Sequence, residues 1–273
     1  MSTSSDTLAF IGGGNMASAL IGGLCKTGRP AASILVVEPF EAQRQRLAQD
    51  FGVRTLAAAD ASLADAALVV WAVKPQLFGE AARPCAAWVS GALHLSVMAG
   101  IRSDAIVRAS GSARVVRSMP NTPALIGRGI AGLFATPAVG ADERALVEQV
   151  LAPTGQTLWV EREADLDAVT ALSGSGPAYV FYFAEAMIAA AVEMGLSAEQ
   201  GKRLALATFD GATALAAQSD EPLALLRERV TSKGGTTYAG LQSLSGDAVD
   251  AAIGKAVKAA QQRAKELGDE FGA

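Results

Sequence analysis

A short glycine-rich motif near the start of the chain constrains the fold more than any other feature. The apolar run Leu8–Ile11 leads directly into Gly12-x-Gly14-x-x-Ala17, and helix-forming residues follow to about Lys26. This order predicts a strand, a tight turn and a helix, an arrangement that binds the pyrophosphate of a dinucleotide. Gly12 would allow the turn, Gly14 would let the phosphates approach the backbone, and Ala17 would let the helix pack closely on the strand.

The first turn of the predicted helix supplies hydrogen-bond donors for such a ligand. The backbone N–H groups of Gly14, Asn15, Met16 and Ala17 have no partners inside the helix, and the helix dipole adds partial positive charge there. We therefore predict that these residues, with Gly12, bind the cofactor. A glycine-rich turn without a ligand is the alternative that this motif alone leaves open.

Alternating strands and helices follow as far as about Glu163. Helices are predicted at 41–49, 76–88 and 142–151. Further strands are predicted at Ile34–Val37, Val53–Leu56, Ala66–Val73, Leu93–Met98, Val115–Ser118, Ile130–Ala135 and Thr157–Val160. Several of these strands are apolar throughout, which is typical of a parallel sheet covered on both faces. The fold class predicted is α/β, with an N-terminal doubly wound, Rossmann-like parallel sheet.

The second half of the chain carries no strand signals and is predicted to be all-helical. Helices are expected at Pro177–Met194, Ala198–Gln218, Pro222–Val230 and Asp247–Leu267. We therefore predict a dinucleotide-binding domain at residues 1–163 and a helical substrate and dimerisation domain at residues 164–273. The helix from Pro177 is apolar on nearly every side, so a small helical domain would have to bury it against a second subunit.

Small or polar residues follow several of the predicted strands. Glu38, Lys74-Pro75 and Pro120-Asn121-Thr122 stand after strand ends, and ligands of open α/β sheets bind beyond the carboxyl ends of the strands. Lys74 could donate to the ribose or nicotinamide side of the cofactor. Asn121, between two prolines, is suited to holding a nicotinamide or to forming only a rigid turn.

Glu38 bears on the choice between NAD and NADP. An acidic residue at the end of the second strand can accept from a ribose 2′-hydroxyl and would repel a 2′-phosphate. Arg44 and Arg46 follow closely, however, and could serve a phosphate. A solvated glutamate at a strand end is the third interpretation. Both NADP and NAD therefore remain candidate cofactors.

A second glycine-rich segment, Thr231-Ser-Lys-Gly-Gly-Thr-Thr237, lies between two predicted helices. Two glycines flanked by hydroxyl groups can form a nest of backbone N–H groups, and such a nest binds a carboxylate. An ordinary helix–helix loop is the alternative. The small-residue turn Ser173-Gly-Ser175-Gly-Pro177 is predicted to pack near it.

Composition and charge exclude several other functions. The net charge of −4 comes without a basic stripe, which disfavours nucleic acid and anionic membranes as partners. His94, the only histidine, lies in an apolar strand and is predicted to be structural. With two unpaired cysteines and no cluster of ligands, no metal site is predicted. The polar start of the chain, Met1–Asp6, lacks the regions of a signal peptide, so a cytoplasmic protein is expected.

Taken together, these motifs resemble those of the pyrroline-5-carboxylate reductase family. The resemblance runs from about Thr7 to Leu267 and is carried by Phe10–Ala17, Ala72-Val-Lys-Pro75, Met119-Pro-Asn-Thr-Pro123, Ser173–Tyr179 and, most specifically, Val230–Thr237. It implies reduction of 1-pyrroline-5-carboxylate to L-proline with NAD(P)H, the last step of proline biosynthesis. It also implies a cytoplasmic enzyme whose helical domains interlock into a homodimer, and possibly a larger ring of dimers.

The resemblance assigns further roles to individual residues. Thr237 is expected to hydrogen-bond the ring nitrogen of the substrate. Its carboxylate would be held by Ser232 and by the N–H groups of Gly234, Gly235 and Thr236, with Ser175 also in the substrate site, and Ala72 and Pro75 would join the cofactor site.

Two positions depart from the family pattern. Lys233 stands where many members carry proline, which bears on the stiffness of the loop. Asp60 lies near the place where an asparagine often contacts the adenosine, which puts the contacts on that side in doubt.

Three other functions stay open at this point. A β-hydroxyacid dehydrogenase would share Gly174-Ser-Gly176, but it would carry a catalytic lysine where this chain has Val180. A reductase of another cyclic imine would use the same groups. A non-catalytic dinucleotide-sensing protein would keep Gly12–Ala17 but would have no use for the segment Thr231–Thr237.

Overall fold

The computed structural model describes residues 7–271 and divides into two compact units. One unit comprises the chain up to Ser175 together with residues from Ala260 onward, and the other comprises Gly176–Ala259. The domain boundary expected between residues 163 and 164 stays a prediction. The segment Met1–Asp6, on which the expectation of no signal peptide rests, lies outside the described residues.

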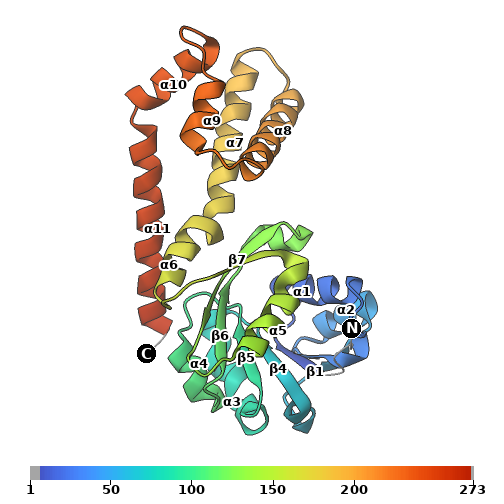
Figure 1. Cartoon of the computed structure of the whole chain (residues 1–273). Coiled ribbons are helices and arrows are strands. Elements are labelled where there is room, and N and C mark those ends of the chain that lie inside the picture. The colour runs from blue at the N-terminus through green and yellow to red at the C-terminus, as the bar shows by residue number, and fades with distance from the viewer. Residues whose placement is uncertain (1–6, 272–273) are drawn as a thin grey trace. The chain divides into compact units, whose positions relative to one another are not determined.

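The first unit is built on an eight-stranded sheet with the order β3-β2-β1-β4-β5-β6-β7-β8 (Figure 1). The strands are β1 Thr7–Ile11, β2 Ile34–Val37, β3 Arg54–Leu56, β4 Ala66–Trp71, β5 Leu93–Ser96, β6 Val115–Met119, β7 Gly129–Ala135 and β8 Gly155–Trp159. The order reverses on either side of β1, because β2 and β4 both pair with it in parallel. The carboxyl end of β1 therefore lies at the point where doubly wound sheets bind their ligands.

One pair of strands departs from the parallel arrangement, because β6 and β7 are antiparallel. Only residues 120–128 connect them, and this connection contains the short 3-10 turn Thr122–Ile126. A parallel crossover needs a dozen or more residues, usually with a helix, so this connection returns the chain in the opposite direction. The other described strand pairs are parallel.

Helices cover both faces of the sheet. Helices α1 (Asn15–Lys26), α2 (Glu41–Phe51) and α5 (Ala141–Leu151) pack on one face, where Leu20, Leu47 and Val150 join Leu8 and Phe10 in a buried core. Helices α3 (Phe78–Val89) and α4 (Ser103–Ser110) pack on the other face. The predicted α/β fold class is confirmed, whereas α4 was not predicted.

The rest of the chain is helical, as predicted. Helix α6 and the π-helical turn after it, at Asp165–Val169 and Thr170–Gly174, were not predicted from the sequence. The remaining helices are α7 Gly176–Glu193, α8 Ala198–Ala217, α9 Leu223–Arg229, α10 Thr236–Gly246 and α11 Val249–Phe271.

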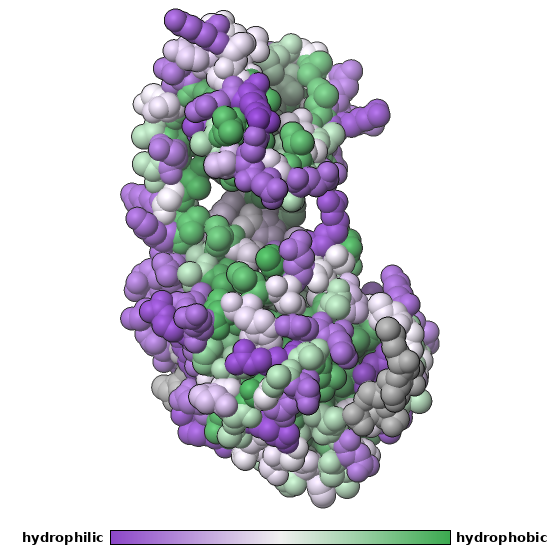
Figure 2. Space-filling view, in the orientation of Figure 1, coloured by the Kyte–Doolittle hydropathy of each residue, from purple (hydrophilic) through white to green (hydrophobic). Residues whose placement is uncertain are grey.

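The helical unit leaves much apolar surface uncovered in a single chain, as Figure 2 shows by hydropathy. Only Ala184 and Ala191 of α7 are buried, while Phe181 and Tyr182 are 60% and 71% exposed. The continuous helical segment Asp165–Glu193 is long and apolar enough to cross a membrane by length and composition alone. Within this unit an apolar cavity of about 260 Å³ opens between α7 and α11, lined by Tyr179, Tyr182, Phe183, Val249, Ala252, Ile253, Ala256 and Val257.

Candidate active site

The turn after β1 requires glycine for two reasons. Gly12 has a φ of +96°, which L-residues with a side chain rarely adopt. A Cβ built on Gly12 would also lie 2.8 Å from the carbonyl oxygen of Ala72 and 2.9 Å from Cγ1 of Val73. Gly12 thus lets the ends of β1 and β4 come into contact, where the Ala72 N–H donates to the Ile11 carbonyl at 2.8 Å.

The next part of the turn is open to a ligand. Gly14 is the N-cap residue of α1, with a φ of −69°, and has no side chain that could cap the amides of the helix start. A Cβ on Gly14 would meet no atom within 4 Å, and both Gly14 and Asn15 are exposed. Ala17 is buried against the sheet. The exposed amides at this helix start fit the pyrophosphate of a dinucleotide.

Side chains from two other elements hold Gly13, the middle residue of the turn. The Gly13 N–H donates to Oε2 of Glu38 at 2.8 Å, and Nε2 of Gln43 donates to the Gly13 carbonyl. The Phe40 N–H donates to the other oxygen, Oε1 of Glu38, at 3.0 Å. Glu38 is only 7% exposed. Sequence reasoning found Glu38 but missed Gln43, whose part depends on the position of α2.

The side chain of Arg44 is hydrogen-bonded to backbone carbonyl groups in the same region. Its Nη1 donates to the carbonyl oxygens of Glu38 and Pro39, at 2.8 Å and 2.7 Å. Arg46, by contrast, is exposed and pairs with Asp50 one turn along α2, at 3.4 Å. Arg44 therefore lies nearer the strand ends than Arg46 does.

An apolar cavity of about 300 Å³ opens beside the glycine turn, beyond the ends of β1 to β4. Its lining residues are Ile11, Gly12, Val37, Pro39, Ala57, Ala58, Ala59, Val73, Leu77, Glu80, Ala81, Pro84 and Cys85. The carboxylate of Asp60 accepts the N–H of Ser62 at 2.9 Å and caps the short 3-10 turn Ala61–Asp65 next to this lining. A narrow apolar cavity with few polar groups suits a flat aromatic ring.

Lys74 and Pro75 follow β4 on the same side of the sheet. Pro75 begins the 3-10 turn Pro75–Leu77, and Lys74 is its exposed N-cap residue. Lys74 is therefore accessible to solvent, and its contact with the cofactor stays a prediction.

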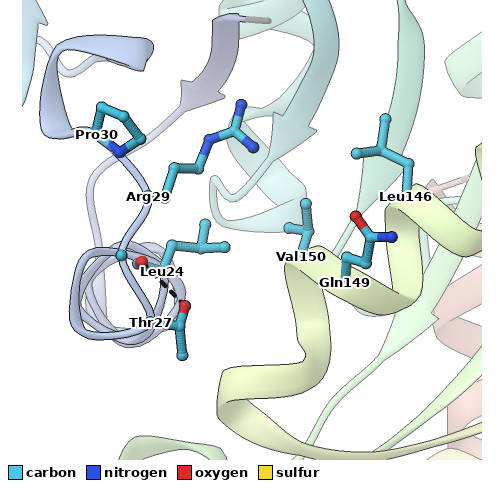
Figure 3. A pocket seen from close by; sticks show the side chains of 8 residues that line it. Leu24, Thr27, Arg29, Pro30, Leu146, Gln149 and Val150 are labelled. Carbon is cyan, nitrogen blue, oxygen red and sulfur yellow. Dashed lines mark hydrogen bonds between the residues drawn. The ribbon is translucent and has the colours of Figure 1, made fainter. Parts of the chain in front are cut away.

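A smaller cavity, of about 180 Å³, lies at the other end of the sheet (Figure 3). Thr27, Arg29 and Pro30, which follow α1, face Gln149 and Val150 of α5 there. Because α1 runs back along the sheet, this cavity is near the amino ends of the strands. It contains none of the residues that the sequence predicted for the site.

Asn121 has internal partners on both sides of its amide. Its Nδ2 donates to the Ser173 carbonyl at 3.2 Å, and its Oδ1 accepts the Ile130 N–H at 3.0 Å. Ser175 ends the π-helical turn, with its N–H donating to the Thr170 carbonyl at 2.8 Å. The predicted nicotinamide-binding residue and the predicted substrate-binding residue thus belong to adjoining segments.

The second glycine-rich segment forms an exposed turn at the start of α10. The Gly235 N–H donates to the Ser232 carbonyl at 3.0 Å, and Gly234 has a φ of +75°. This combination is typical of a type II turn with Lys233 at its second position. Gly235 is the N-cap residue of α10, and it has no side chain that could cap the first amides of the helix.

The hydroxyl-bearing residues around this turn are accessible. Thr236 and Thr237 are the first residues of α10, and both are exposed, as is Ser232. Exposed amides and hydroxyls at a helix N-terminus form a site suited to a carboxylate.

His94 is structural, as the sequence predicted. Its Nδ1 accepts from Nε1 of Trp71 at 3.0 Å, and its Nε2 lies 3.1 Å from the Val89 carbonyl. Burial lowers the pKa of His94 to about 4, so the ring is neutral at physiological pH. Burial also raises the pKa of the Cys85 thiol, to about 11. Within residues 7–271 no group of three or more metal-ligating side chains comes together.

Comparison with known proteins identifies the family. Residues 163–267 match the description "Pyrroline-5-carboxylate reductase dimerisation", and residues 7–100 match "NADP oxidoreductase coenzyme F420-dependent". A pyrroline-5-carboxylate reductase of Pseudomonas aeruginosa is 42% identical over 98% of this chain and 99% of its own length. The chain belongs to the pyrroline-5-carboxylate reductase family.

Solved structures of this family have the same fold. A pyrroline-5-carboxylate reductase of Coxiella burnetii is 34% identical, with a TM-score of 0.91 over 96% of this chain and 98% of that one. The Plasmodium falciparum enzyme, solved with NADP bound, is 30% identical, with a TM-score of 0.85 over 96% and 98%. The predicted family is confirmed, and so is the prediction of an NAD(P)H-dependent oxidoreductase that reduces pyrroline-5-carboxylate.

Proposed function

We propose that this chain reduces 1-pyrroline-5-carboxylate to L-proline, the last step of proline biosynthesis, and that it accepts both NADPH and NADH. The near full-length relationship to the Pseudomonas aeruginosa reductase carries the proposal. The bound cofactor supplies a hydride to the imine carbon, and the imine nitrogen takes a proton, so the C=N bond becomes CH–NH. The protein has to position the two molecules and stabilise the nitrogen.

The first unit would hold the cofactor. The amides of Gly14, Asn15, Met16 and Ala17 bind the pyrophosphate, and the cavity of about 300 Å³ takes the adenosine side. Gly12 keeps the turn close to Ala72, and Lys74 and Pro75 follow on the side of the ribose and nicotinamide.

Acceptance of both cofactors is supported by the position of Glu38. Its two carboxylate oxygens accept backbone N–H groups from Gly13 and Phe40, and the side chain is 7% exposed. Because both of its oxygens already accept backbone N–H groups, this carboxylate is less available to accept from a 2′-hydroxyl, so it favours NADH less than an exposed one would. We expect turnover with each cofactor, and the ratio of kcat/KM for NADPH and NADH measures the preference directly.

The helical unit would hold the substrate. The carboxylate of 1-pyrroline-5-carboxylate is bound by Ser232 and by the amides of Gly234, Gly235 and Thr236, in the exposed turn before α10. Thr237 lies on the first turn of the same helix, and its hydroxyl hydrogen-bonds the ring nitrogen. This bond stabilises the nitrogen as its charge changes in the transition state.

Replacement of Thr237 by valine tests this role, because the shape is kept and the hydroxyl is lost. We expect kcat/KM for 1-pyrroline-5-carboxylate to fall by about 100-fold, with little change in the Kd for NADPH. Thr213→Val is the matched control, since Thr213 is an exposed threonine of α8 that bonds only within its helix. An unchanged kcat/KM for Thr237→Val would disprove the role. If the unmodified protein binds NADPH but shows no turnover, the assignment of 1-pyrroline-5-carboxylate as its substrate would be wrong instead.

A homodimer formed through the helical unit is part of the same proposal. Phe181, Tyr182 and Met187 of α7 are exposed in the single chain, and an apolar surface of this kind is usually covered by a partner. The rate per chain should fall on dilution together with the average mass from light scattering. A fully active monomer would contradict the dimer. We further propose a cytoplasmic enzyme that binds neither membrane nor nucleic acid, in which dimers are able to form a larger ring.

A further inference from the structure

Asn121 connects three segments of the first unit. It lies in the connection between β6 and β7, its Oδ1 accepts the N–H of Ile130 in β7, and its Nδ2 donates to the carbonyl of Ser173, 52 residues further along the chain. An amide side chain both accepts and donates through one rigid planar group. Backbone groups therefore fix both the oxygen and the nitrogen of this amide.

The segment that Asn121 reaches is an unusual one. Thr170–Gly174 is a π-helical turn closed by the bond from the Ser175 N–H to the Thr170 carbonyl. Such wide turns are rare and are often found at functional sites. The Ser173 carbonyl stands four residues before Pro177, which has no backbone N–H, so this carbonyl is available to a side chain from elsewhere.

The same turn also lies close to the end of a strand. A Cβ built on Gly174 would lie 2.7 Å from Cε of Met119, the last residue of β6. Gly174 therefore allows the π-helical turn to lie directly against the strand end from which Asn121 follows. The hydrogen bond of Asn121 holds Ser173 in place, and Gly174 leaves room beside it for the side chain of Met119.

We propose that Asn121 is a positioning residue for the substrate site, acting through the Ser173–Ser175 turn, and is not a ligand of the nicotinamide. This inference rests on the proposed function, because it takes Ser175 as part of the site for 1-pyrroline-5-carboxylate. It replaces the direct cofactor contact that the sequence suggested for Asn121. Its consequence is that loss of the Asn121 amide impairs use of the substrate while cofactor binding persists.

The test is Asn121→Asp, which preserves the size of the side chain. The carboxylate still accepts the Ile130 N–H, but its second oxygen faces the Ser173 carbonyl and repels it. Displacement of the turn should lower kcat/KM for 1-pyrroline-5-carboxylate by about 100-fold. The Kd for NADPH, measured by fluorescence titration without substrate, should change by less than about twofold. Gln149→Glu makes the same chemical change at an exposed position of α5 and serves as control.

A second set of variants displaces the turn without altering Asn121. Gly174→Ala places a methyl group 2.7 Å from Cε of Met119, the movable end of that side chain, and should give a smaller loss of the same kind, with cofactor binding kept. Adding Met119→Ala removes the obstructing atoms and should restore most of kcat/KM. These variants also test the proposal if Asn121→Asp does not fold.

Failure of this inference and failure of the proposed function give different results. A large rise in the NADPH Kd of Asn121→Asp, with an unchanged KM for the substrate, would make Asn121 a cofactor ligand and overturn the inference. Wild-type kinetics in both Asn121→Asp and Gly174→Ala would also overturn it. A wild-type protein that binds NADPH but does not reduce the substrate would overturn the proposed function itself, and this role with it.

Discussion

The two glycine-rich loops of this chain both precede a helix, yet they are supported in different ways. Gly13 is held by Glu38 and Gln43, which lie 25 and 30 residues further along the chain. Among residues 7–271, the turn before α10 has only local bonds, such as Gly235 to Ser232 and Thr231 to Arg227. Contacts between distant parts of the chain support the first loop, and neighbouring residues alone support the second.

This difference indicates how far each loop is ordered before its ligand binds. A loop fixed by buried, long-range contacts is formed before its ligand arrives, whereas an exposed loop with local bonds opens at low cost. We therefore expect the cofactor turn to be ordered in a single chain. The substrate turn should gain its order from the substrate and from a second subunit.

The largest effect should come from Gly12→Ala. Alanine at a φ of +96° is strained, and its methyl group would meet the backbone of Ala72. We expect the free energy of unfolding to fall by about 3 kcal/mol or more, with loss of NADPH binding. Thermal unfolding and NADPH titration measure both.

Gly234→Ala is the matched change in the other loop. Gly234 has a φ of +75°, but a Cβ there would meet nothing within 4 Å. Only the conformational strain remains, which costs about 1 kcal/mol. Equal losses for Gly12→Ala and Gly234→Ala would contradict the difference in support between the two loops.

Acid should destabilise the sheet unit through its buried histidine. The pKa of His94 is lowered to about 4 by burial, while that of an unfolded chain stays near 6.5. Between these values the unfolded state binds a proton that the folded state does not. Stability is therefore complete above pH 6.5 and falls as the pH drops towards 4, by about 3 kcal/mol. Denaturant unfolding at a series of pH values measures this loss.

His94→Gln isolates the contribution of the histidine from those of other groups. Glutamine does not titrate, and its amide can accept from Trp71 and donate to the Val89 carbonyl, as the ring does. The difference in stability between wild type and variant should therefore change with pH between 4 and 6.5. A constant difference would mean that His94 titrates in the folded protein as it does in the unfolded chain.

Glu38→Gln tests whether the cofactor turn depends on its distant support. Glutamine offers one acceptor oxygen in place of two, so either Gly13 or Phe40 loses its partner. We expect a loss of about 1–3 kcal/mol in stability, with NADH and NADPH affinities reduced by the same factor. A selective gain in NADPH affinity would show instead that the carboxylate repels the 2′-phosphate of NADPH.

The sequence was sufficient for features that depend on neighbouring residues. Apolar runs such as Leu8–Ile11 and Ala66–Trp71 identified buried strands, and the spacing of Gly12, Gly14 and Ala17 identified the turn that joins β1 to α1. In each case the signal is local, because one strand or one turn uses consecutive residues.

Features that depend on distant residues were not predictable in the same way. Gln43 and Asn121 act through bonds to residues 30 and 52 positions away, and their surrounding sequence gives no sign of those partners. Helix α4 is short and of mixed polarity, and the π-helical turn is rich in small residues, so neither gave a strong periodic signal. The antiparallel pairing of β6 and β7 follows from the short connection between them, whose length depends on where both strands end.

The smallest expected effect concerns the locally supported loop and comes from Lys233→Pro. Lys233 occupies the second position of the turn, where proline is favoured in type II turns. Proline restricts the unfolded chain, so a compatible site gains about 0.4–1 kcal/mol. We expect the thermal unfolding midpoint to rise by about 1–3 °C.

Lys233→Ala separates this effect from the loss of the lysine charge. Alanine removes the charge but restricts the chain much less, so it should leave the midpoint near that of wild type. If the loop is locally supported as described, Lys233→Pro should also lower the KM for 1-pyrroline-5-carboxylate slightly, because a stiffer turn loses less freedom on binding. A lower midpoint for Lys233→Pro than for Lys233→Ala would mean that proline does not fit the turn, and that this loop is held in another conformation.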